Sequence, residues 1–260
     1  MNPDLSYASQ NANASPEPAP QSFFTRLIGV YFSPGETFQE IGRAPRVLAP
    51  IIALALLTVV LSYVASTRLP MDKLLTQRID EAVQSGQINE EQAERQREGM
   101  RKIAPYMKIF FPIIGLISSI VVPLIIAGIA KLASLIMGIE NNFLSLFAVA
   151  LYATLAISII SSLLFLILLF VKPADEFDIT NPLGSNLSAL LSLLGVTGLS
   201  KFLKTLLSFV DVFFIWRIML LGIGFAAVSR RLKTSTAITV TGVIGLVIAL
   251  CSAGWTAMFG

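Results

Sequence analysis

The sequence predicts an all-α, polytopic integral membrane protein with five transmembrane helices, N-terminal interfacial helices and a helical hairpin between the first two spans. Composition is the first observation behind this prediction: of 260 residues, 55% are hydrophobic and only 13% are charged, and the mean hydropathy is +0.76. Water-soluble domains carry about 25% charged residues, so lipid must surround much of this chain. The second observation is a set of apolar runs that reach the length of about 20 residues that a bilayer-spanning helix needs.

These runs define the predicted spans in order. The first is bounded by Arg46 and Arg68, the second is interrupted only by Lys131, and the fourth contains Asp211 and Arg217. The third is long enough to tilt or to extend past the bilayer. The spans belong to one membrane domain over residues 22–260 and cover about 47–67, 109–137, 143–171, 206–228 and 237–259.

The N-terminal region precedes the first span. Residues 1–21 are rich in Asn, Ala, Ser and Pro and are predicted to be a disordered tail. A helix that contains Arg26 follows, and its spacing predicts an amphipathic segment in the membrane interface, with apolar residues at Phe23, Phe24, Leu27, Ile28 and Tyr31. A second short helix is predicted after it, with Ser33 at the N-cap, Pro34 next and Glu36 completing a capping box.

A polar module over residues 68–108 separates the first two spans. Leu75, Ile79 and Val83 recur every four residues, and Asn89 is placed to begin a second helix laced with opposite charges. We therefore expect a short helical hairpin packed on the membrane domain. Its charged helix is either a solvated face or a protein-docking site.

Several chemistries lack the residues that they need. The chain has no His and a single Cys, Cys251, which we expect to be a small buried residue. The acidic residues near Asp175 lack calcium-loop spacing and predict a solvated turn. An aspartyl protease would need two apposed carboxylates, and only Asp211 lies well inside a predicted span. No catalytic, metal or cofactor-binding residues are predicted, and 19 basic against 16 acidic residues without a basic stripe do not indicate nucleic-acid binding.

Asp211 and Arg217 are candidate functional residues, because charge inside a membrane is costly. Six positions along a helix separate them by about 120° and about 9 Å, which disfavours a direct pair on one helix. We expect each side chain to meet a partner elsewhere or to reach toward an interface. A structural contact and ion or proton handling both remain open for Asp211.

Small residues form two stripes at four-residue spacing. Such residues let helix backbones approach closely in lipid, so the stripes predict helix interfaces. A hydrophilic transport path is the alternative for the first stripe. The candidate interface residues are Ala150, Thr154, Ser158 and Ser162 on the third span and Gly245, Ala249 and Ala253 on the fifth.

The chain also resembles bacterial members of the Yip-one domain (Ypt-interacting protein, YIP) family. The resemblance covers about residues 22–258 and depends on the order and spacing of several pieces rather than on any one of them. These pieces are Phe32-Ser33-Pro34-Gly35-Glu36-Thr37-Phe38, Arg43-Ala44-Pro45-Arg46, Asn181-Pro182-Leu183 with Asn186, and the run from Ser208 to Gly224 around Asp211 and Arg217.

The resemblance implies a five-helix membrane protein with a cytoplasmic N-terminus and no known catalytic residues. Eukaryotic relatives look like organisers of vesicle traffic that contact prenylated Rab-type GTPases. The Asp-Leu-Tyr/Trp-Gly-Pro motif of those proteins is absent from this chain, which makes GTPase binding doubtful here.

The sequence therefore predicts a non-enzymatic membrane scaffold or interaction protein whose partners are the bilayer and other membrane proteins or itself. A small transporter or channel that uses Asp211 and Arg217 is the alternative. The basic cluster Arg230-Arg231-Lys233 favours a cytoplasmic N-terminus, and we expect the bacterial inner membrane as the location.

Overall fold

The computed structural model describes residues 21–84, 86, 88–173, 177, 181–196 and 198–259. Within these residues the chain is helical, with one isolated bridge between Asn186 and Asp211, so the predicted all-α class is confirmed. The tail predicted over 1–21 lies outside the described residues except for Gln21. The helices are α2 (Phe23–Phe32), α3 (Pro34–Arg43), α4 (Leu48–Arg68), α5 (Met71–Gln84), α6 (Glu90–Ile136), α7 (Phe143–Val171), α8 (Leu187–Leu193), α9 (Lys201–Ser208), α10 (Val212–Val228) and α11 (Thr234–Phe259).

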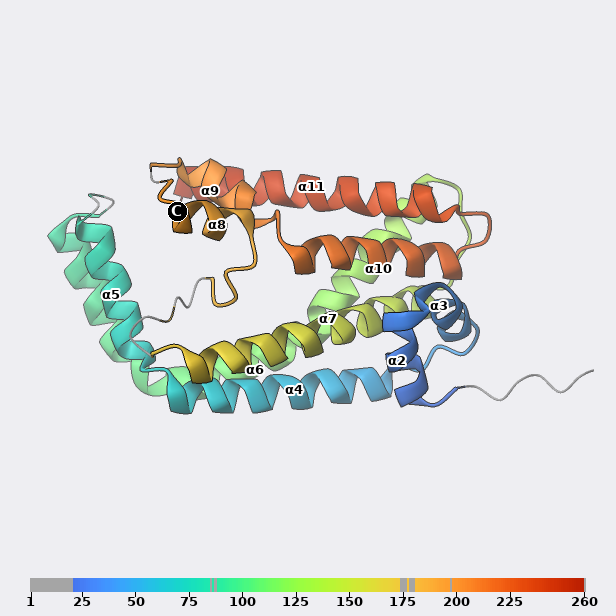
Figure 1. Cartoon of the computed structure of the whole chain (residues 1–260), viewed down its shortest axis with the longest axis horizontal. Helices are drawn as coiled ribbons and strands as arrows, with labels where there is room; N and C mark the ends of the chain where they lie inside the picture. The colour runs from blue at the N-terminus through green and yellow to red at the C-terminus, as the bar shows by residue number, and fades with distance from the viewer. Residues whose placement is uncertain are drawn as a thin grey trace, which may run out of the picture.

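Long apolar helices make up the body of the molecule. Four segments are long and apolar enough to cross a membrane: α4, residues Ile109–Ile136 of α6, α7 and α11. α10 is apolar but has only 17 residues, about 25 Å of helix against a hydrocarbon core of about 30 Å. Figure 1 shows α4, α10 and α11 running along the long axis of the molecule, with α7 between α4 and α10 and α6 passing obliquely behind α7. The fold is therefore that of a multi-pass membrane protein.

α7 is the central helix of the bundle and contacts α2, α3, α4, α6 and α10. Its residues from Ser145 to Ala153 are all buried. A helix that is apolar on every side can be buried on every side, which explains this position. Two polar groups anchor the N-terminal helices to it: the Ser145 hydroxyl donates to the Gly42 carbonyl at 3.0 Å, and the Tyr31 hydroxyl donates to the Ala156 carbonyl at 2.7 Å.

The pair α2 and α3 closes one end of this bundle. Phe38 and Ile41 of α3 are completely buried, and α3 packs against both α7 and α10. Gly224 of α10 makes this approach possible, because a Cβ there would lie 2.3 Å from the Val149 side chain and 3.2 Å from the Phe38 ring. The N-terminal helices therefore lie at one end of the bundle and also contribute buried residues to its core.

The outer face of α2 is apolar. Phe24, Ile28 and Phe32 recur every four residues and are 70%, 57% and 84% exposed. α2 also lies across the direction of the long helices in Figure 1. Both features fit a helix in the membrane interface. The capping box predicted at the start of α3 is wrong. Ser33 is the N-cap, but its side chain makes no capping hydrogen bond, and its ψ of 62° is far from the extended backbone typical of a capping residue.

α6 runs for 47 residues from the polar module into the membrane. Asn89 begins it with a reciprocal capping box, in which Gln92 N donates to Asn89 Oδ1 at 2.8 Å and Asn89 N donates to Gln92 Oε1 at 3.1 Å. α5 folds back against the first part of this helix. The resulting hairpin projects from one end of the molecule, where Figure 1 shows α5, and does not lie on the membrane domain as the sequence suggested.

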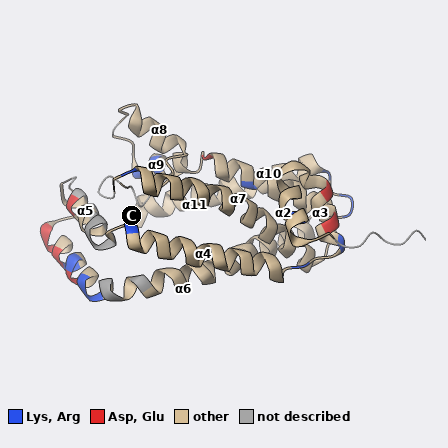
Figure 2. Cartoon of the chain, turned by 60° about the horizontal axis from the view of Figure 1, so that its bottom comes forward, with Lys and Arg blue, Asp and Glu red and all other residues tan. Residues whose placement is uncertain are grey.

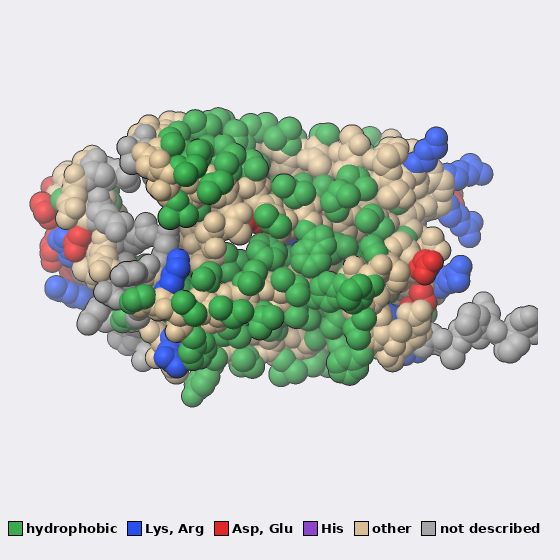
Figure 3. All heavy atoms as spheres, viewed as in Figure 1, with side chains coloured by type: hydrophobic (Ala, Val, Ile, Leu, Met, Phe, Trp, Pro, Cys, Tyr) green, Lys and Arg blue, Asp and Glu red, His purple; other side chains and the backbone are tan. Residues whose placement is uncertain are grey.

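Charge and apolar surface are separated in space. Figure 2 shows the charged residues gathered mainly at the two ends of the long helices, and Figure 3 shows an apolar surface between those ends. This distribution is that of a protein whose middle contacts lipid. Cys251 lies exposed on α11, so the expectation of a buried cysteine is wrong: a small apolar residue gains as much from lipid as from a protein core.

Candidate functional site at the start of α10

The fourth predicted span is not one continuous helix. α9 ends at Ser208 and α10 begins at Val212, and Asp211 between them has an extended backbone with φ −128° and ψ 140°. The Asp211 carboxylate caps α10, because its Oδ1 accepts from the backbone N–H of Phe213 at 2.9 Å and of Phe214 at 3.0 Å. The sequence placed Asp211 within a continuous helix. The structure instead makes Asp211 the N-cap of α10.

A loop is joined to this break. Leu187 N donates to the Val210 carbonyl at 2.9 Å, and the Ser185 hydroxyl donates to Asp211 Oδ2. On the same loop, Asn186 caps α8 through Ala189 N at 3.0 Å and donates from Nδ2 to Asn181 Oδ1 at 2.9 Å. The loop and the start of α10 thus form one hydrogen-bonded unit.

The break lies near the middle of the adjacent helix. A Cβ on Gly222 of α10 would lie 2.7 Å from Ile238 Cα near the beginning of α11. A Cβ on Gly245, close to the midpoint of α11, would lie 3.1 Å from the Phe214 ring, and α9 packs along α11 as well. Two shorter helices with a break between them therefore lie against one long helix, and the break is deep within the apolar zone.

Two hollows adjoin this break. One, the polar hollow, has a volume of about 330 Å³ and a lining that is about half polar, to which Ser161 of α7, the 181–186 loop, Asp211 and Arg217 contribute. Figure 3 shows an opening in this part of the apolar face. The other, of about 390 Å³, is almost entirely apolar and lies between α6, α10 and α11. Arg217, Phe209 and Phe214 line both hollows.

Arg217 is half-buried on α10, and its Nε is buried without a hydrogen-bond partner in the part of the chain that the structure describes. The described residues also give Arg217 no carboxylate within ion-pair distance, so Asp211 and Arg217 share the polar hollow without forming a salt bridge. Asp211 instead has the backbone amides and Ser185 as partners. The structure therefore brings the two candidate residues into one hollow, where Asp211 has hydrogen-bond partners for both oxygens and the Arg217 Nε has none among the described residues.

The small-residue stripes lie inside the chain. Ala150, Ser162, Gly245, Ala249 and Ala253 are buried, and Thr154 and Ser158 are half-buried. Gly245 faces Phe214 and Ile218 of α10. These faces are already occupied by helices of the same molecule. The acidic residues Asp175, Glu176 and Asp178 lie outside the described residues, and no group of three or more possible metal-ligating side chains is found in the described ones.

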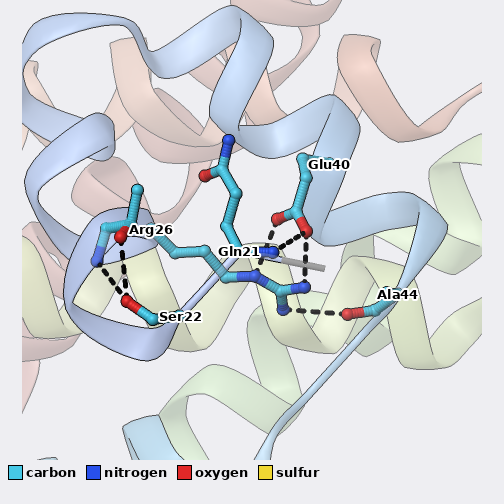
Figure 4. Close-up of polar contacts among 6 residues, drawn as sticks. Gln21, Ser22, Arg26, Glu40 and Ala44 are labelled. Carbon is cyan, nitrogen blue, oxygen red and sulfur yellow. Dashed lines mark hydrogen bonds and ion pairs between the residues drawn. The ribbon is translucent and has the colours of Figure 1, made fainter. Parts of the chain in front are cut away.

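One buried polar pair was missed by the sequence analysis. Arg26 of α2 is fully buried, and its guanidinium contacts both carboxylate oxygens of Glu40 on α3, at 2.7 and 2.8 Å (Figure 4). It also donates to the Ala44 carbonyl at 2.8 Å, while Gln21 N donates to Glu40 Oε1 at 3.0 Å. The signal in the sequence was Arg26 itself, a charge amid apolar residues of a short helix, with Glu40 fourteen positions later.

A polytopic helical membrane protein with interfacial N-terminal helices and a broken fourth apolar segment is thus the class that these features define. A sequence model of the Yip1 domain matches residues 28–256, which is most of the chain. The chain belongs to the Yip1 domain family, as the resemblance in its motifs indicated. Comparisons with curated proteins and with solved structures give no match.

Proposed function

We propose that this Yip1-family protein is a non-enzymatic membrane scaffold, and that its α5–α6 hairpin is the surface to which partner proteins dock. The observation that carries this proposal is the unbroken α6 helix. Because one helix of 47 residues contains both a membrane span and one side of the hairpin, continuous helix joins the hairpin to the membrane domain. Its first 19 residues extend about 28 Å beyond the start of the span at Ile109.

The hairpin is organised rather than merely polar. Ile79 of α5 and Ala93 of α6 are buried at its centre, and Arg97 of α6 contacts Asp80 of α5 at 2.6 Å. The hydrogen bond to Asp80 raises the pKa of Arg97 above its ordinary value, so this cation persists at every physiological pH. The outer face of the hairpin presents exposed charges of both signs, including the pairs Glu91–Arg95 and Glu98–Lys102. Mixed charge on an ordered surface supports selective docking.

The membrane domain supplies the anchor. We infer that α10, together with α9, forms the fifth crossing, since the two cover α11 along its length. The basic cluster Arg230-Arg231-Lys233 follows α10 at the end of the molecule where α2 and α3 lie (Figure 2), which favours a cytoplasmic N-terminus under the positive-inside rule. The proposed location is the bacterial inner membrane, and the proposed partners are other membrane proteins or a second copy of this chain.

Photo-crosslinking in cells tests the docking role. A photoreactive residue is placed at Glu91 or Arg95 on the outer face of the hairpin, and the control is placed at Val247, which is exposed on the lipid-facing side of α11. The expected result is a discrete crosslinked protein from the hairpin positions and only diffuse lipid adducts from Val247. Absence of any protein adduct at both hairpin positions, together with a monomeric state in native-lipid particles, would contradict the proposal.

A small transporter or channel is the second candidate function, and the polar hollow that contains Asp211 and Arg217 is the observation that favours it. Discontinuous helices with their ends inside the membrane are typical of transporters. Flux of ions and metabolites into sealed liposomes tests this alternative. Asp211→Asn is the informative variant, because Asn is as good an N-cap as Asp and removes the charge, while the Ser185 hydroxyl can turn to accept from the new amide group. Flux that disappears in this variant would favour transport over a scaffold role.

A further inference from the structure

The apolar hollow between α6, α10 and α11 has the properties of a ligand site. Its volume of about 390 Å³ falls at the lower end of the range for small-molecule pockets, which is about 300 to 1,000 Å³. Ala237 and Ile248 line it along α11, and eleven residues of helix make it about 16 Å long. Val122, Ile125 and Ile248 at its rim are also exposed on the surface that contacts lipid. A long, narrow apolar molecule from the bilayer fits this shape.

Among the described residues that line this hollow, Arg217 is the one that carries a charge. Its Nε is buried without a partner among the described residues. A buried N–H of a guanidinium that has no hydrogen-bond acceptor costs free energy, and an anion that reaches Nε would remove that cost. Asp211 does not fill this role, because its oxygens are taken by Phe213 N, Phe214 N and the Ser185 hydroxyl. The position of Arg217, where the apolar and polar hollows meet, is where the anionic head of an amphiphile would bind.

We propose that this groove binds a long-chain fatty acid from the bilayer, with the carboxylate on Arg217 and the alkyl chain between α6, α10 and α11. A carboxylate suits a guanidinium because the two pair through parallel hydrogen bonds. One guanidinium balances one negative charge, and Asp211 in the same polar hollow opposes a dianionic phosphate head. The volume accommodates one chain rather than two. This binding is independent of the hairpin and goes beyond the scaffold role.

Photolabelling of the full chain in phosphatidylcholine nanodiscs tests the proposal. The probe is a fatty acid with a diazirine near the end of its chain, and the comparison probe is the fatty alcohol of the same length. Labelling by the acid is expected on the groove faces of α6 and α11, and competition by unlabelled fatty acid should remove it. Because a charge-assisted hydrogen bond changes binding by about tenfold or more, the alcohol should label these positions about tenfold less.

Three variants make the test specific. Arg217→Gln should reduce groove labelling by about tenfold, and Arg217→Lys should retain most of it. Ala133→Phe, which fills the groove from α6 without changing any charge, should also reduce it. Arg68→Gln is the matched control, because it removes a cation at the end of α4, where its guanidinium lies 4.3 Å from the Phe170 ring and away from the groove.

Each result decides the question. Equal labelling by acid and alcohol would mean that lipid chains fill the groove without selectivity, and the proposal would be overturned. The same conclusion would follow if Arg217→Gln folds and labels like the unaltered protein. Should Arg217→Gln fail to fold, the comparison of acid with alcohol on the unaltered chain and the Ala133→Phe variant remain sufficient to confirm or to refute binding.

Discussion

The buried pair of Arg26 and Glu40 predicts an unusual pattern of stability changes. Methionine approximates the volume of both side chains, so we consider Arg26→Met, Glu40→Met and the variant with both substitutions. Either single substitution leaves one buried charge without its partner, whereas the double variant leaves none. We therefore expect the double variant to be more stable than either single one.

The magnitudes follow from the contacts. Breaking a buried pair costs about 3 to 5 kcal/mol. We expect the lower end, about 3 kcal/mol, for Glu40→Met, because Arg26 keeps its hydrogen bond to the Ala44 carbonyl at 2.8 Å. Arg26→Met should cost about 2 to 3 kcal/mol, since the Glu40 side chain is 20% exposed and gains some hydration. In the double variant the main loss is the hydrogen bond to Ala44, about 1 kcal/mol.

Thermal unfolding of the purified protein in one detergent is the assay. For a chain of this size, about 3 kcal/mol corresponds to a fall in Tm of about 10 °C, and about 1 kcal/mol to about 3 °C. Glu36→Met on the exposed first turn of α3 is the control, and its Tm should change by less than about 3 °C. The reasoning would be refuted if the two single losses simply added in the double variant.

Three further predictions concern the site, the helix contacts and the hairpin. Asp211→Ala should lower the free energy of unfolding by about 1 to 2 kcal/mol, because it removes the cap of α10. Asp211→Asn should stay within about 0.5 kcal/mol of the unaltered protein. Similar Tm values for the two variants would contradict the capping role. Gly222→Ala should lower the free energy of unfolding by about 1 to 3 kcal/mol, because the new Cβ would meet the α11 backbone. Gly128→Ala is the control and should be neutral or stabilising, because the space around Gly128 is open. Equal Tm values for the two variants would argue against a tight α10–α11 contact. Arg97→Gln should speed proteolysis of α5 a few-fold and Arg95→Gln should not, because Arg97 pairs with Asp80 of α5 whereas Arg95 pairs with Glu91 of its own helix. Equal cleavage rates would argue against a stabilising role of the Arg97–Asp80 pair.

Helix positions in the membrane were predictable where apolar runs end at charges or caps. The predicted span at 143–171 coincides with α7, because Asn142 caps one end and Lys172 follows the other. Asn89 likewise begins α6 as its position in the sequence indicated. These boundaries depend on local chemistry, namely hydrogen-bonding caps and the cost of charge in lipid, and local chemistry is written directly in the sequence.

The candidate site was predictable only in part. Asp211 and Arg217 stood out because charge inside an apolar run is rare. Their different roles could not be predicted, because the helix break at 209–211 depends on a loop that is distant in sequence. Ser185 and Leu187 of that loop form hydrogen bonds with Asp211 and Val210, and these bonds compete with a continuous helix. Sequence periodicity near Asp211 contains no information about that loop.

The sequence by itself determined that this is a helical membrane protein that resembles the Yip1 domain family and that carries a charged helical hairpin between its first two spans. The low fraction of charge and the long apolar runs suffice for that, because the bilayer imposes helices on any such chain. Only the tertiary structure decided that Arg26 pairs with Glu40, that the small-residue stripes face helices of the same chain, and that Arg217 lies between two hollows with no partner for its Nε among the described residues. Those outcomes depend on which surfaces meet, and contacts between residues far apart in sequence follow from packing rather than from local pattern.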